Sequence, residues 1–169
     1  MALELNGTTG VSLVQDGVVT AADLASGAIT ASALPTGSVL QVVQNTYSTK
    51  ADLASASWTD TGFSASITPS SASSKILIIV TTPIYWNGNG MSMRLLRGTT
   101  PIFTPPVNYT YHLSTASNSR AVYTMQYLDS PDSTTAVTYK TQGIGHSTVS
   151  ADTSADSNTS VMTFMEIAG

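Results

Sequence analysis

Apolar and polar residues alternate along most of the chain after residue 38, with the period expected of β-strands that are buried on one face. The clearest case is Phe63-Ser64-Ala65-Ser66-Ile67, in which every second side chain is apolar. Residues 107–113, 123–127 and 137–140 alternate in the same way. We expect each of these segments to form a short strand of one antiparallel fold.

Three further segments are apolar on both faces. Residues 38–44 are mostly apolar and predict a first strand. The five aliphatic residues from Ile76 to Val80 predict a central strand that is covered on both sides. The last apolar stretch, Val161 to Ile167, predicts a strand that is buried within the sheet or at a subunit contact.

Turn signals separate these segments. Asn87-Gly88-Asn89-Gly90 predicts a hairpin turn, after which Met91, Met93 and Leu95 face one way. Residues 142–160 have little periodicity and predict the longest surface loop. About eight strands and no long helix predict an all-β fold, a jelly-roll-like antiparallel β-sandwich.

The first 37 residues follow a different pattern, with a repeat of ten residues. Its glycines are Gly7, Gly17, Gly27 and Gly37, followed two places later by Val19 and Ile29 and seven places later by Leu24 and Leu34. Thr20 and Thr30 each precede a segment suited to one helical turn. Such short repeats bury their apolar side chains only against other copies or other chains. We therefore predict an attachment arm or shaft at 1–37 and a head domain at 38–169; the alternative is a disordered arm with evenly spaced glycines.

Composition narrows the class of protein. Only 9% of the residues are charged, whereas 26 threonines and 24 serines supply neutral hydroxyl groups, which favours an all-β extracellular or virion surface. The net charge is −4 and the six basic residues are scattered, so we expect no nucleic-acid binding. Cysteine is absent, and no apolar run is long enough for a membrane span. We expect a soluble chain without a secretory signal and without membrane insertion.

The sequence offers little for catalysis or metal binding. The only histidines are His112 and His146, and neither lies in a catalytic motif. Asp152 and Asp156 suggest a calcium loop, but the spacing lacks the mid-loop glycine and the closing glutamate. We expect no enzyme activity and no cofactor.

Aromatic and amide side chains form the candidate host-contact set: Trp86, Asn87, Tyr109, Tyr111 and His112. Rigid aromatic faces beside amides suit sugars and flat protein surfaces. The loop at 147–160 is a second candidate contact. The alternative is that the tyrosines belong to the core of the sandwich and place only their hydroxyl groups at its rim.

Three segments of the chain resemble a known family: LNGTTGVSLVQDGVVTAADLASGAIT, WTDTGFSASITPSSASSKILIIV and the ending MTFMEIAG. In these segments the chain is similar to short fibre proteins of tailed bacteriophages, those of cyanobacteria and marine bacteria above all. The resemblance covers nearly the whole chain and is strongest for residues 63–80 and for the last strand. It implies β-sandwich heads on homotrimeric fibres or spikes, with the arm attached to another virion protein.

The repeats, the scarcity of charge and the strands that are apolar on both faces also favour an obligate oligomer. We hypothesise a homotrimeric virion fibre that contacts a host glycan or protein. The first alternative is a capsid decoration or head fibre that stabilises the particle. The second is a spike that cleaves host glycans, for which the chain is short.

Overall fold

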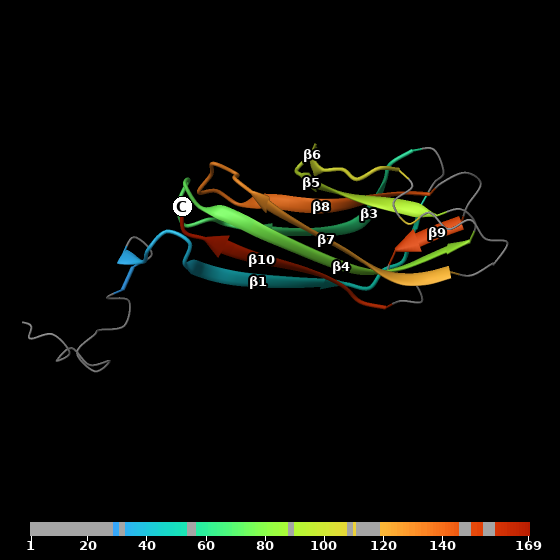
Figure 1. Cartoon of the computed structure of the whole chain (residues 1–169), viewed down its shortest axis with the longest axis horizontal. Coiled ribbons are helices and arrows are strands. Elements are labelled where there is room, and N and C mark those ends of the chain that lie inside the picture. Colours follow the sequence, from blue (N-terminus) through green and yellow to red (C-terminus); the bar gives the residue numbers. More distant parts are fainter. Residues whose placement is uncertain are drawn as a thin grey trace, which may run out of the picture. The chain divides into compact units, whose positions relative to one another are not determined.

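The computed structural model describes residues 29–30, 33–53, 57–87, 90–107, 110, 119–145, 150–153 and 158–169 (Figure 1). The chain divides into two units, Met1–Pro35 and Thr36–Gly169. The second unit is referred to below as the head. The division into an arm at 1–37 and a head domain at 38–169 stays a prediction.

Two antiparallel sheets make up the described part of the head (Figure 1). The six-stranded sheet contains β1 (Val39–Tyr47), β10 (Ser160–Ile167), β4 (Lys75–Asn87), β7 (Ser119–Asp129), β9 (Ser150–Thr153) and β2 (Ala51–Leu53). The four-stranded sheet contains, in spatial order, β3 (Thr59–Ile67), β8 (Val137–Gly145), β5 (Met91–Arg97) and β6 (Thr100–Phe103). The predicted all-β, antiparallel sandwich is confirmed.

The alternating segments form strands because they bury one face. In β3, Phe63, Ala65 and Ile67 are buried, and the residues between them are exposed. Tyr123 and Met125 are likewise buried in β7. These strand predictions are confirmed, because the period of two matches the one-sided burial.

The hydrophobic core lies between the two sheets. Ile76, Ile78 and Val80 enter it from β4, and Met93 and Leu95 enter it from β5. Each fully buried side chain of this size stabilises the fold by about 1.5–3 kcal/mol. The core therefore supplies much of the free energy that holds the two sheets together.

The last strand is buried within the sheet, as one of the two predictions for it proposed. β10 pairs with β1 on one side and with β4 on the other. Its inward face carries Met162 and Phe164, both fully buried, and the ring of Phe164 lies 5.4 Å from the ring of Tyr139.

The predicted hairpin at residues 87–90 is wrong. β4 belongs to the six-stranded sheet and β5 to the four-stranded sheet, so the chain crosses between layers here. One edge of β4 is paired along its length with β7, and the other edge with β10 and then β9. No edge of β4 remains for β5, which pairs with β8 and β6 instead.

The predicted long loop at 142–160 is also wrong in part. β8 continues to Gly145, and residues 150–153 form β9, which pairs with β4 and β2. The sequence of β9 shows no strong apolar alternation. Backbone hydrogen bonds to the neighbouring strands hold it in the sheet, so periodicity alone did not predict it.

The strand predicted at 107–113 does not begin at Val107, because Val107 lies in a turn. Most of the remaining residues of this segment lie outside the described ones.

A polar link joins the sheets at the end of β7. The carboxylate of Asp129, which is 6% exposed, accepts hydrogen bonds from Arg97 at 2.9 and 3.1 Å and from the Tyr139 hydroxyl at 2.7 Å. Asp129 belongs to the six-stranded sheet, and its two donors belong to the four-stranded sheet. Burial and the neighbouring carboxylate raise the pKa of Tyr139, so its hydroxyl stays protonated and donates at all ordinary pH values.

We expect Asp129→Asn to lower the free energy of unfolding by about 1–3 kcal/mol, because the buried Tyr139 hydroxyl and the partly exposed Arg97 guanidinium lose their charged acceptor. Urea unfolding at a fixed protein concentration measures the effect. Asp60→Asn is the matched control. Its carboxylate pairs with Lys140 at 2.9 Å but is 55% exposed, and we expect a loss of about 0–1 kcal/mol. Equal losses in the two variants would contradict the proposed role of Asp129.

Candidate functional site

The head has two different ends. At the junction end, the Gly37 N–H donates to the Ala168 carbonyl and the Ala168 N–H to the Ser38 carbonyl, both at 2.8 Å. At the distal end, the register pairs Trp86 with Ser119 and Met91 with Gly145. Figure 1 shows the C-terminus at one end of the head and β9 at the other. The strand ends that lead into the predicted contact loops therefore meet at the end of the head opposite Gly37 and Ala168.

Trp86 does not contribute an exposed aromatic face. Its side chain is only 7% exposed and packs in the core between the sheets. The expectation that Trp86 is exposed is wrong, because the inward positions of β4 continue in steps of two from Ile76 to Trp86. The polar and glycine residues that follow Trp86 in the sequence had suggested that the Trp86 side chain is exposed.

The other host-contact candidates are described only in part. Asn87 is the last residue of β4, at the distal end. Tyr109, Tyr111 and His112 lie outside the described residues, as does much of the 147–160 segment. Their role as host contacts stays a prediction.

A group of side chains that the sequence reasoning missed lies on the outer face of the four-stranded sheet. This polar cluster consists of Trp58, Asp60, Arg94, Lys140 and Gln142. The Arg94 guanidinium lies 4.5 Å from the centre of the Trp58 ring and donates to the Gln142 side-chain oxygen at 2.5 and 2.8 Å. Gln142 and Lys140 both donate to the Asp60 carboxylate, at 2.6 and 2.9 Å.

Beside the polar cluster, an irregularity in β3 opens a small cavity. The register between β3 and β8 shifts between Asp60 and Ser64, and Gly62 has a φ of 80° there. A side chain at Gly62 would overlap the Tyr47 ring, which packs against this glycine from β1. The cavity has a volume of about 140 Å³ and is lined by Asp60, Gly62, Phe63, Ser64, Lys140 and Thr141.

The polar cluster contains one carboxylate, one amide and two cationic groups, so hydrogen bonding is the chemistry that it offers. Hydrogen bonds from Lys140 and Gln142 lower the pKa of Asp60, so this carboxylate stays ionised and accepts hydrogen bonds at neutral pH. An accepting carboxylate beside donating amide and ammonium groups suits a hydroxyl-rich surface. Within the described ranges, no group of three or more acidic, histidine or cysteine side chains is placed to hold a metal ion.

Each member of the polar cluster occupies a polar position of an alternating strand or lies beside one. That signal was visible in the sequence. The members come together through the pairing of β3 with β8 and of β8 with β5, and the sequence did not reveal this pairing.

A second polar group closes the junction end. Glu166 is fully buried, and its carboxylate accepts hydrogen bonds from the Ser70 N–H and hydroxyl, both at 2.7 Å, and from the Gln41 amide at 2.6 Å. Burial raises the pKa of Glu166, but the hydrogen bonds from Ser70 and Gln41 outweigh this and lower the pKa below its ordinary value. This carboxylate joins β1, β10 and the loop before β4.

The predicted arm residues are described only near the head. The Ala33 N–H donates to the Thr30 carbonyl at 2.9 Å. Ile29 and Leu34 are 54% and 38% exposed, and Gly37 has a φ of 92°. The remaining predicted arm residues lie outside the described ones: Gly7, Gly17, Val19, Leu24 and Gly27.

Comparison with known proteins assigns no relative. No protein-family model matches the chain. No curated protein matches it either. Among the described residues, no helix has the length and apolar character that a membrane span requires.

We expect Trp86→Ala to destabilise the head by about 3–5 kcal/mol, because it empties a buried site in the core. Trp58→Ala is the natural control: Trp58 is partly exposed, and its contact with Arg94 contributes about 0.5–1 kcal/mol. Thermal unfolding of both variants followed by circular dichroism measures the difference. A Trp86 variant with wild-type stability would show that the indole is not a core residue.

We expect Glu166 to make the stability depend on acid pH. Because its folded pKa lies below the ordinary value of 4.5, its contribution is complete above that pH and is lost as the pH falls through the folded pKa. Glu166→Gln removes this contribution, so its deficit in unfolding free energy relative to wild type is largest at neutral pH and shrinks in acid. Urea unfolding across the acid range measures both proteins. A deficit that stays constant with pH would refute the assignment.

Proposed function

We propose that this protein is a structural component of a bacteriophage virion: a homotrimeric fibre or spike whose jelly-roll-like head contacts the host surface. Residues 1–37 attach it to another virion protein. The observation that carries the proposal is the separation of the two ends of the head. The chain enters the head beside its own C-terminus, whereas the strand ends at Asn87, Met91, Ser119 and Gly145 gather at the opposite end.

This geometry suits a displayed module. β4 has 13 residues, and a strand of that length extends about 40 Å. The sandwich can therefore hold its distal loops away from the point of attachment, on a scaffold that the core makes rigid. Binding residues on loops that a rigid β-sandwich positions are a common arrangement in recognition proteins.

The path of the chain supports the jelly-roll-like arrangement. Successive strands change layer: β3 lies in the four-stranded sheet, β4 in the six-stranded sheet and β5 again in the four-stranded sheet. The first and last strands, β1 and β10, are neighbours. Connections that pass from one antiparallel sheet to the other are typical of Greek-key and jelly-roll sandwiches.

The surface chemistry favours adhesion over catalysis. The polar cluster offers a carboxylate, an amide and two cations on the outer face of the four-stranded sheet. Such groups hydrogen-bond to hydroxyl-rich or polar surfaces without any reacting group. A glycan-cleaving spike would need paired carboxylates in a groove, and the Asp60 carboxylate is instead paired with Lys140.

Gold-labelled antibodies against the head, applied to virions that carry this chain, test the proposal in electron micrographs. We expect the label on the tail or baseplate, and we expect antibody fragments directed at the distal end to block adsorption to host cells. Label on the capsid with unchanged adsorption would support the decoration role instead. Virions without any label would overturn both functions.

A further inference from the structure

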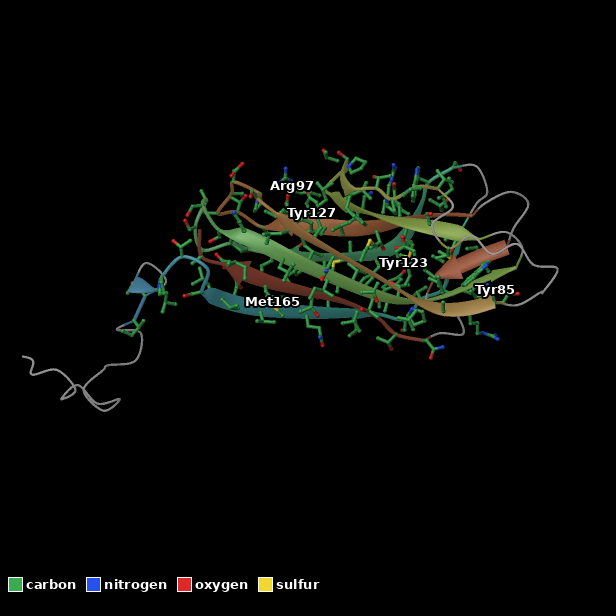
Figure 2. The ribbon with its side chains drawn as sticks, in the orientation of Figure 1. Tyr85, Arg97, Tyr123, Tyr127 and Met165 are labelled. Atoms are coloured by element: carbon green, nitrogen blue, oxygen red, sulfur yellow. The ribbon has the colours of Figure 1, made fainter. Side chains whose placement is uncertain are left out.

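A row of apolar side chains crosses the outer face of the six-stranded sheet. The register places Val42 of β1 opposite Met165 of β10, Met165 opposite Leu77 of β4, and Leu77 opposite Leu128 of β7. Paired residues of an antiparallel sheet share a face, so the row is continuous across four strands. Val42 is 58% exposed and Leu128 is 50% exposed. Figure 2 shows Met165 on the outer side of the sheet and Tyr123 between the sheets.

The apolar surface extends beyond this row. Val39 and Val122, on the same outer face, are 51% and 64% exposed. Ile79 and Val161 lie between them and are partly exposed. The resulting set, called here the outer apolar face, comprises Val39, Val42, Leu77, Ile79, Val122, Leu128, Val161, Met165 and Ile167. Threonine and glutamine side chains lie among them on the same face (Gln44, Thr46, Thr81, Thr124, Gln126 and Thr163), so the apolar surface is unbroken along the first row and neutral elsewhere. Large exposed apolar patches on a protein surface mark interaction sites.

The outer apolar face lacks charge. Between Lys75 at one end of β4 and Arg120 near the other, every described outward residue of β1, β10, β4 and β7 is neutral. Arg120 itself lies over the Tyr85 ring at 5.5 Å. The acidic residues of these strands, Asp129 and Glu166, are buried. A partner on this face therefore buries no charge there, and a charged partner surface would remain unpaired.

A second copy of the chain meets this requirement. In a cyclic trimer, each copy turns this face towards the symmetry axis and meets the same neutral face of its two neighbours, so no like charges oppose each other. Four strands at a spacing of about 4.8 Å and a length of eight to nine residues give a face of about 500 Å². That area can form the centre of an interface that buries about 800 Å² from each partner. The other broad sheet face carries the polar cluster and is less suited to this role.

We propose that the outer apolar face of the six-stranded sheet is the surface through which copies of this chain assemble, with other copies covering Val42, Met165, Leu77 and Leu128. The inference rests on the homotrimer of the proposed function and assigns its contact surface. It leaves the four-stranded sheet and the distal end turned outward, free for host contact.

Light scattering of the purified full-length protein and two lysine variants tests the inference. We expect wild type to have a mass near three times 17.5 kDa and Leu128→Lys to shift towards the monomer at the same concentration, because the lysine charge would be buried at the interface. Thr138→Lys is the matched control on the exposed outer face of the four-stranded sheet, and we expect it to keep the wild-type mass. Circular dichroism verifies that Leu128→Lys retains its strands.

The outcomes separate the two proposals. A trimeric wild type whose Leu128→Lys variant is folded and still trimeric would overturn the assigned face and leave the proposed function intact. A monomeric wild type would overturn the face together with the homotrimer.

A cysteine probe keeps the test decisive if Leu128→Lys fails to fold. The chain has no cysteine, so Leu128→Cys and Thr138→Cys each introduce a single thiol. We expect a maleimide to label Leu128→Cys at least about tenfold more slowly than Thr138→Cys in the native protein, and equally fast in urea. Equal native rates would overturn the inference.

Discussion

The pairing of β4 on both edges is the constraint on which the rest of the head depends. β7 occupies one edge of β4, and β10 and β9 occupy the other. Its inward residues Ile76, Ile78 and Val80 fill the core, while its outward residues Leu77 and Ile79 stay partly exposed. Because no edge is free, the chain after Asn87 crosses to the second sheet, and the sandwich closes around the core. The same strand thus sets both the inner packing and the outer apolar face.

Polar contacts fix the relative positions of segments that hydrophobic packing alone does not fix. Packing of Met, Ile and Phe side chains is tolerant of small shifts, because hydrophobic contacts have no direction. The hydrogen bonds of Asp129 to Arg97 and Tyr139 have direction and join the two sheets at one point. At the junction end, the hydrogen bonds that Glu166 accepts join β1, β10 and the loop before β4. Both carboxylates are buried and accept several hydrogen bonds, so each fixes the relative position of segments far apart in the sequence.

Local periodicity predicted the strands well where one face is apolar, as in residues 63–67 and 123–127, because a period of two follows from burial of alternate side chains. It failed at residues 87–90, since the choice between a hairpin and a crossover depends on which strand edges are already occupied. β9 was missed because neighbouring strands hold it. The prediction that Trp86 is exposed failed because polar residues next to it in the sequence do not show whether its side chain packs against the other sheet. The polar cluster requires the β3–β8–β5 register, which is a property of the whole fold.

Together, these features give the head four distinct regions: the junction end, the distal end and two unlike faces, of which one carries the outer apolar face and the other the polar cluster. In the trimer that we propose, three copies would share their apolar faces and display three polar faces and three distal ends outward, so that weak contacts with a repetitive host surface would add up. A cryo-electron microscopy reconstruction of the purified full-length protein tests this arrangement most directly. We expect the outer faces of β1, β10, β4 and β7 to be turned towards neighbouring copies, with Val42 and Leu128 buried. An assembled particle in which these side chains face solvent would contradict it.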